Sequence, residues 1–177
     1  LGTSGIVEPM SQQAILDTIQ LEMGQAALRA VSPRRLILAP GNYGLDYLHE
    51  TYPQFADIPV VKTSNFIGDT LDIAAAAHFK QVLLVGHIGK LCKLAGGIMN
   101  THSHEGDCRM ELLAAAGIRE NVSLKCLKKI LDCVTTEEAL AFIDAEGKKE
   151  DVMEDIMKKI DFYLKKRAAG RLQIECI

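Results

Sequence analysis

The residues best suited to chemistry lie in one dense segment, residues 86–109, which combines glycines, basic side chains and histidines. Lys90, Lys93 and Arg109 concentrate positive charge there, although the formal net charge of the chain is −3 at pH 7. Beside glycine-rich loops, such a cluster suits a substrate that carries carboxylates. An ordinary solvated charged face is the alternative interpretation.

The histidines of this segment have several possible roles. His87 and His102 are candidates for proton handling, and a buried, hydrogen-bonded structural histidine is the alternative for each. The pair His102-x-His104, followed by Cys108, does not have the spacing of zinc ligands, so we expect no metal held by the protein.

A phosphate-binding loop does not fit the start of this segment. The Walker pattern needs four residues between its glycines and a Ser or Thr after its lysine. Gly86 and Gly89 are separated by only two residues, and Leu91 follows Lys90.

Two earlier loops offer groups that could meet a small ligand. Residues 40–44 (Pro-Gly-Asn-Tyr-Gly) let the backbone approach a ligand closely, and Gly41 or Gly44 can take a positive φ. Residues 64–69 (Ser-Asn-Phe-Ile-Gly-Asp) offer an amide, an aromatic face and a carboxylate, a set that suits an adenine ring and a ribose diol. Ordinary turn chemistry with helix capping is the alternative for each loop.

The elements around these loops predict an α/β fold. Apolar runs at residues 36–39, 59–62 and 82–85 predict buried parallel strands that end at these loops, where ligands bind in open sheets. Residues 123–170 have mostly helical periodicity, and residues 171–177 alternate as expected for an antiparallel edge strand with one wet face. Ser11, Ser123 and Thr135 stand where they could cap the start of a helix. We therefore expect one domain over residues 1–177, with a three-layer, mostly parallel, Rossmann-like sheet and a helical C-terminal region.

Composition excludes several classes of protein. The 177 residues are 48% hydrophobic and 24% charged, which is ordinary for a globular domain. The negative net charge argues against nucleic acid as a partner. No apolar run approaches the roughly 20 residues of a membrane span, and no signal peptide is visible. The 5 cysteines include no C-x-x-C pair, which indicates a reducing, cytoplasmic location.

Four motifs occur in this order in one known family. They are Gly-Thr-Ser-Gly-Ile-Val-Glu-Pro-Met-Ser at residues 2–11, the Pro-Gly-Asn-Tyr-Gly turn, and residues 64–68 and 86–103. In these motifs the chain resembles the cobalt-precorrin-5B C-1 methyltransferases, the CbiD family of anaerobic cobalamin biosynthesis. One departure is His104, which stands where the family pattern leads us to expect an arginine or lysine.

The resemblance implies methylation of a corrinoid ring that depends on S-adenosylmethionine and converts cobalt-precorrin-5B to cobalt-precorrin-6A. It further implies that this chain is the C-terminal, methyl-donor-binding part of a longer enzyme, that the N-terminal half is absent, and that the fragment alone is inactive. The acetate and propionate groups of a corrinoid account for the local lysines and arginine. The cobalt travels with the substrate, and a homo-oligomer is one possible assembly.

With this resemblance, the loop residues receive expected roles. Those expected to bind the methyl donor are Thr3, Gly5, Gly41, Asn42, Gly44, Asn65, Phe66, Asp69 and Gly86. Those expected to bind the substrate are Lys90, Lys93, Thr101, His102 and Arg109, and the candidates for proton handling are His87 and His102.

Two other functions stay open at this point. One is a non-catalytic nucleotide- or corrinoid-binding module. The other is the dinucleotide-binding domain of an oxidoreductase, against which stands the lack of a Gly-x-Gly-x-x-Gly motif after any predicted strand.

Overall fold

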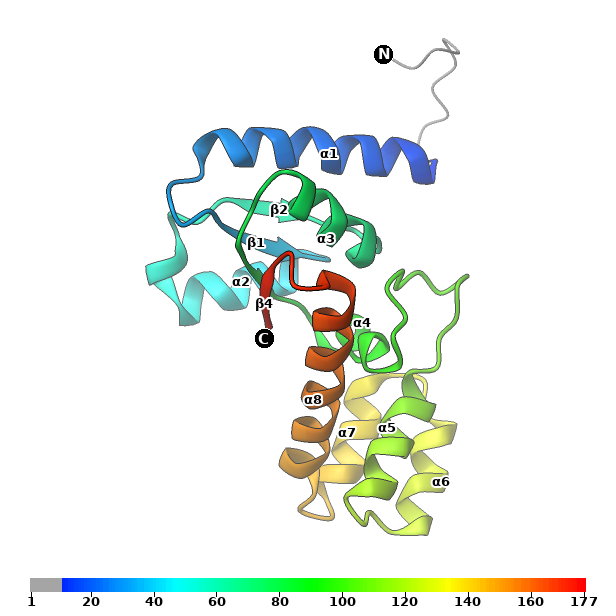
Figure 1. Ribbon diagram of the computed structural model, residues 1–177. Helices are drawn as coiled ribbons and strands as arrows, with labels where there is room; N and C mark the ends of the chain where they lie inside the picture. Colours follow the sequence, from blue (N-terminus) through cyan, green and yellow to red (C-terminus); the bar gives the residue numbers. More distant parts are fainter. Residues whose placement is uncertain (1–10) are drawn as a thin grey trace.

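The computed structural model describes residues 11–177 and contains a four-stranded parallel sheet in the order β2-β1-β3-β4 (Figure 1). Its strands are β1 (Arg35–Ala39), β2 (Val60–Lys62), β3 (Gln81–Leu84) and β4 (Gln173–Cys176). The register pairs Leu38 of β1 with Val61 on one side and with Leu84 on the other. The three strands predicted from apolar runs are confirmed, with bounds shifted by about one residue.

The expectation of an antiparallel edge strand is wrong, because β4 pairs in parallel with β3 and Leu84 lies opposite Cys176. The reason is the preceding helix α8 (Lys149–Ala168), which packs against β4 and returns the chain to the amino end of the sheet. The expected wet face is present, since Ile174 is buried whereas Gln173 and Glu175 are exposed.

The two faces of the sheet are covered unequally. Helices α1 (Gln12–Arg29), α3 (Ile67–Ala76) and α8 pack on the face of Leu36 and Leu38, which belongs to the main hydrophobic core. The opposite face, around Ile37 and Val85, has only a small cluster under α2 (Asn42–Thr51) and the 3-10 helix η1 (Pro53–Phe55). The expected three-layer arrangement is therefore not confirmed.

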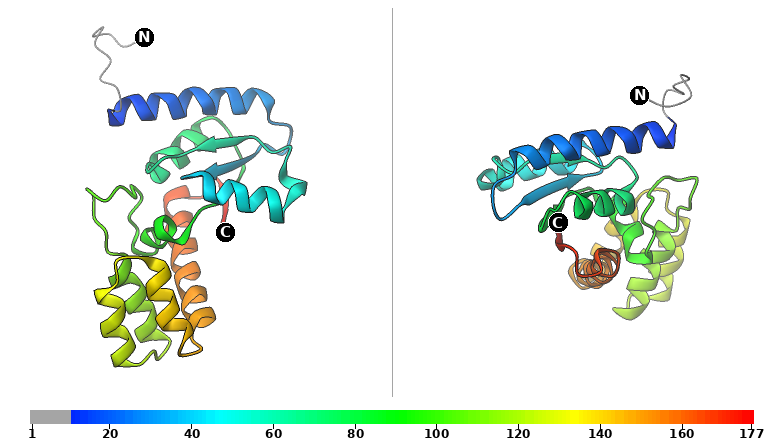
Figure 2. Two further views of the ribbon diagram at one scale, coloured as in Figure 1. Left: turned by 180° about the vertical axis from the view of Figure 1, so that it is seen from behind. Right: turned by 45° about the horizontal axis from the view of Figure 1, so that its top comes forward.

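The helical C-terminal region extends away from the sheet, as Figures 1 and 2 show. It comprises α4 (Ile88–Leu91), the 3-10 helix η2 (Cys92–Gly96), α5 (Arg109–Arg119), α6 (Leu124–Asp132), α7 (Thr136–Asp144) and α8. The side chain of Ser123 caps α6 by accepting from Cys126 N at 3.2 Å. Thr135 caps α7 in the same way, accepting from Glu138 N at 3.2 Å. Both caps agree with the spacing of these residues in the sequence.

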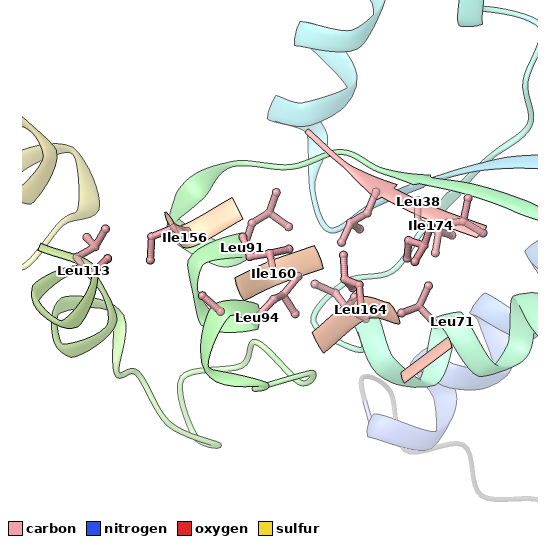
Figure 3. Packing of buried hydrophobic residues seen from close by; sticks show 14 of the residues in the cluster. Leu38, Leu71, Leu91, Leu94, Leu113, Ile156, Ile160, Leu164 and Ile174 are labelled. Atoms are coloured by element: carbon pink, nitrogen blue, oxygen red, sulfur yellow. The ribbon is translucent and has the colours of Figure 1, made fainter. Parts of the chain in front are cut away.

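One row of buried side chains on α8 connects the helices to the sheet (Figure 3). Ile156 lies toward Leu113 of α5, whereas Leu164 lies toward Ile174 of β4, and Ile160 stands between them. The position of the glycine-rich loops thus depends on both parts of the chain, because η2 packs against this helix.

Candidate functional site

The carboxyl ends of β1 and β3 form a topological switch point. The chain leaves β1 through α2, which packs on the face of Ile37, and leaves β3 through α4 and η2, which pack into the main core on the other face. The two adjacent loops therefore diverge, and this is where open α/β sheets bind ligands.

Two of the cavities at these strand ends have Pro40 and Gly41 in their walls. The α1 cavity, about 400 Å³, is lined by Ala14, Ile15, Thr18, Ile19, Glu22, Pro40, Gly41, Lys62 and Ser64. The switch-point cavity, about 330 Å³, is lined by Pro40, Gly41, Tyr43, Gly44, Gly86, His87, Gly89, Lys90, Arg109, Thr135, Thr136 and Glu137.

The glycines of these loops have different structural roles. A Cβ on Gly44 would lie 2.6 Å from the Val85 carbonyl oxygen, and one on Gly86 would lie 2.9 Å from Cγ of Pro40. A Cβ on Gly41 would meet no atom within 4 Å. Neither Gly41, at φ −176°, nor Gly44 has a positive φ, so that expectation is wrong. Gly44 and Gly86 allow the loops to pack closely, whereas Gly41 exposes its backbone to the cavities.

The amino end of α2 opens at the same place. Gly41 is its N-cap residue and has no side chain to cap the helix, and Asn42, the first helical residue, is exposed. The first-turn N–H groups are therefore left to solvent or to a ligand, for which a carboxylate is well suited.

Two cations line the switch-point cavity. Lys90 Nζ donates a hydrogen bond to the Pro40 carbonyl oxygen at 2.8 Å, and burial together with neighbouring Lys93 lowers the pKa of Lys90. Arg109 pairs with Asp107, with Nη2 2.8 Å from Oδ2, and this pairing raises the pKa of Arg109. Carboxylates are the natural ligands of such a pair.

Lys93, by contrast, is buried in the following loop. Its side chain is 5% exposed, and Nζ donates to the carbonyl oxygens of Thr101 (3.1 Å) and Gly106 (2.9 Å). Lys93 lines neither cavity, and its ammonium holds the 97–108 loop together.

The same loop is tied to the turn after β2. Thr101 N donates to the Asn65 carbonyl oxygen at 2.9 Å, and Thr101 Oγ1 lies 3.3 Å from Asn65 Oδ1. The ring of Phe66 is 6% exposed and faces the core. Asp69 Oδ1 lies 3.7 Å from Arg167 Nη2. The structure thus brings Asn65 and Thr101 together. Neither of these residues lines the α1 cavity or the switch-point cavity, and the same holds for Phe66 and Asp69.

His87 stands in the switch-point cavity with a carboxylate partner. Its Nδ1 accepts from Gly89 N at 3.3 Å, and its Nε2 lies 3.1 Å from Glu137 Oε1. Because Nδ1 accepts, Nε2 carries the proton that faces Glu137. His102 lies in the 97–108 loop, where its Nδ1 accepts from His104 N at 3.2 Å, and it lines neither cavity.

The sequence did not reveal the contribution of the amino end of α7. The residues of this helix start that line the switch-point cavity are Thr135, Thr136 and Glu137. The capping spacing of Thr135 predicted that a helix begins there, but it could not predict that this helix begins beside the cavity. The expected methyl-donor residues Thr3 and Gly5 lie outside the described residues.

Two general findings concern residues 11–177. No three His, Cys, Asp or Glu side chains in this range are grouped so that they could hold a metal ion. No helix in the described part of the chain is long and apolar enough to span a membrane.

Comparisons with known proteins agree with the motifs. Residues 100–177 match the family model described as CbiD, C-terminal domain. The whole chain is 41% identical to the cobalt-precorrin-5B C(1)-methyltransferase of Ruminiclostridium cellulolyticum and covers 45% of that protein. It is 38% identical to the protein of that name from Methanocaldococcus jannaschii, of which it covers 48%.

The chain therefore spans about half the length of the curated relatives that it matches. No solved structure matches it significantly. The motifs and these comparisons lead to one conclusion, which is that the chain belongs to the CbiD family.

Proposed function

We propose that the chain is the methyl-donor-binding part of a cytoplasmic enzyme that transfers a methyl group from S-adenosylmethionine to C-1 of cobalt-precorrin-5B, giving cobalt-precorrin-6A in anaerobic cobalamin biosynthesis. Relatives named cobalt-precorrin-5B C(1)-methyltransferase support the reaction. The observation that carries the placement is Gly41, whose open backbone separates two cavities at the strand ends.

The α1 cavity fits the methyl donor. Gly41 leaves room for a ligand beside the backbone, and Ser64 and Glu22 add a hydroxyl and a carboxylate to the walls. An acidic side chain suits a ribose diol and also attracts a sulfonium cation. Glu22 thereby fills the role that the sequence suggested for Asp69, whose carboxylate lies near Arg167 instead.

The switch-point cavity fits the charged edge of the substrate. Lys90 and Arg109 offer two cations in this cavity, which shares Pro40 and Gly41 with the α1 cavity. Charge-assisted bonds from these groups to corrinoid carboxylates would place the ring close to Gly41. Methyl transfer requires the reacting atoms at roughly 3–3.5 Å with water excluded, so adjacent sites are an advantage.

When bound, S-adenosylmethionine supplies an electrophilic methyl group, so no nucleophile of the protein is required. Transfer of that group as a cation also means that the methylated ring must lose a proton. His87 is our candidate acceptor, through Nδ1, once the 3.3 Å bond from Gly89 N opens. Glu137 beside Nε2 would stabilise the resulting imidazolium. His102 is the second candidate.

Thermal unfolding of this chain with S-adenosylhomocysteine, NADP or ATP separates the candidate functions. Only S-adenosylhomocysteine should raise the unfolding temperature, by an amount that grows with ligand concentration above the Kd. A rise with NADP alone would indicate an oxidoreductase domain. A rise with ATP alone would favour a non-catalytic nucleotide-binding module. If none of the three ligands raises the unfolding temperature, a non-catalytic corrinoid-binding module is favoured.

A further inference from the structure

A row of aromatic rings runs from the switch-point cavity along α2 to η1. The centroid of the Tyr43 ring lies 5.9 Å from that of the His87 ring. Tyr47 follows one helical turn later on the same side of α2. The row continues with Tyr52, whose ring centroid lies 6.1 Å from that of Tyr47, and with Phe55, whose ring centroid lies 5.9 Å from that of Tyr52. Such a row presents flat apolar area beside the cations of the cavity.

The first two rings do not stabilise the core of the protein. Tyr43 is 80% exposed and Tyr47 is 49% exposed, whereas the inward side of α2 carries Gly44 and Leu48. Leu48 packs with Ile37 in the small core cluster below the helix. The outward tyrosines therefore belong to neither core cluster of the described residues, and a binding role would account for their exposure.

A cavity of about 540 Å³, which we call the tyrosine cavity, lies beside these rings. Tyr43 and His87 line both this cavity and the switch-point cavity, so the two are adjacent. The walls of the tyrosine cavity also include Tyr47, Ile88 and Met157. No Asp, Glu, Lys or Arg side chain of residues 11–177 lines it.

We propose that the tyrosine cavity binds the flat apolar face of the corrinoid macrocycle, while Lys90 and Arg109 bind its peripheral carboxylates. The inference rests on the proposed function, because that function supplies the substrate class. A macrocycle with a flat conjugated face and a charged rim matches an apolar surface bordered by two cations. The length of the aromatic row exceeds what an adenine ring alone would need.

Absorption titration of the 177-residue chain with hydrogenobyrinic acid, a metal-free corrin with free carboxylates and no axial ligand on either face, tests this assignment. Replacing both rings (Tyr43→Ala with Tyr47→Ala) should weaken binding about tenfold, because the stacking and apolar contacts are lost. The matched control is Phe162→Ala, which removes a ring that is 57% exposed on α8, and it should bind as tightly as the wild type. Tyr43→Phe with Tyr47→Phe keeps the rings and should also retain binding.

The methyl ester of the same corrinoid separates stacking from charge. The double alanine variant should weaken binding of the acid and the ester alike, whereas Lys90→Ala should weaken binding of the acid alone. A wild-type chain that does not bind the acid would overturn the assignment. So would a double alanine variant with unchanged affinity for both corrinoids.

The same variants show which proposal fails. The double alanine variant should keep the affinity of the wild type for S-adenosylhomocysteine, because both tyrosines lie outside the α1 cavity. Tyrosine-dependent corrinoid binding without any binding of S-adenosylhomocysteine would uphold the macrocycle site and contradict the methyl-donor function. If the chain binds S-adenosylhomocysteine but the double alanine variant binds the corrinoid as tightly as the wild type, the methyl-donor function is upheld and the macrocycle site is contradicted.

Discussion

Gly41 and Gly44 lie in one turn and have opposite roles at the scale of single residues. Gly44 is needed because α2 approaches the backbone of Val85 and Gly86 too closely for any Cβ. Gly41 has open space around it and an extended φ of −176°, which other residues also adopt. The sequence predicted the importance of both glycines, but only the tertiary approach of α2 to β3 distinguishes their roles.

Alanine at these two positions should therefore have different effects on stability. Gly44→Ala should lower the free energy of unfolding by about 1–3 kcal/mol, because backbone atoms must move to admit the methyl group. Gly41→Ala should leave the free energy of unfolding nearly unchanged. Urea denaturation of both variants checks this, and equal stability of the two would contradict the packing described for Gly44.

Lys90 and Arg109 carry the electrostatic part of the proposed substrate site. Lys90→Ala should weaken binding of a carboxylate-bearing corrinoid by roughly 1.5–3 kcal/mol, the usual value of one charge-assisted contact. Lys128→Ala, which removes an exposed lysine on α6, is the control and should have no effect. In an enzyme of full length, Arg109→Ala should raise the KM for the corrinoid, and an unchanged KM would remove Arg109 from the site.

Some partners of the candidate residues could not be read from the sequence. His87 was identified as one of the histidines of residues 86–109, yet Glu137, which pairs with it, lies fifty residues later in the chain. Lys93 was grouped with the other cations by its charge, whereas its burial and its bonds to Thr101 and Gly106 are tertiary features. Residue type predicted the chemistry available, and the fold determines which groups can meet.

At the scale of secondary structure elements, local signals were reliable and strand direction was not. The caps of Ser11, Ser123 and Thr135 involve neighbouring residues only, and all three are present. The alternation of residues 171–177 correctly predicted a strand with one wet face. Its direction depends on where α8 delivers the chain, which local alternation does not encode.

An ion cluster links α3 to the end of α8. Asp72 Oδ2 lies 2.5 Å from Arg167 Nη2, and Asp72 Oδ1 lies 2.7 Å from Arg171 Nη2. Burial alone would raise the pKa of Asp72, but hydrogen bonds from Arg171 and Arg167 outweigh it and lower the pKa. The cluster therefore stabilises the fold most when Asp72 is ionised.

This arrangement predicts a pH-dependent stability difference between wild type and Asp72→Asn. The folded-state pKa is lowered, so the contribution is fully present above the unfolded value of about 3.9 and is lost as the pH falls through the folded value. Because Asp72 is 39% exposed, we expect about 1 kcal/mol or less at pH 7. Thermal unfolding of both proteins from pH 7 to pH 3 measures this difference in stability. A difference that grows on acidification would contradict the stabilising role of ionised Asp72.

At the scale of the whole molecule, the sequence motifs and the family model cover complementary parts of the chain. The motifs lie between Gly2 and Arg109, whereas the model matches residues 100–177. The structure joins these parts through α8, which packs against η2, α5 and β4. The strands that carry these loops and the helices that complete the switch-point cavity thus share one core.

The open cavities suggest that this chain binds ligands without completing the reaction by itself. A corrinoid is a broad ligand, and burying most of it requires walls on both sides, which domain interfaces commonly provide. We expect no labelled methyl group in cobalt-precorrin-5B after a single-turnover experiment with this chain and labelled S-adenosylmethionine. Stoichiometric labelling would show instead that these residues form the complete active site.

The central claim is that the methyl donor binds beside Gly41, and titration calorimetry with S-adenosylhomocysteine tests it most directly. The wild-type chain should bind one equivalent, whereas Gly41→Val should lose most of the affinity while keeping the unfolding temperature, because the added side chain fills open space beside the backbone. Absence of binding to the wild type, or equal affinity in a folded Gly41→Val variant, would contradict the account.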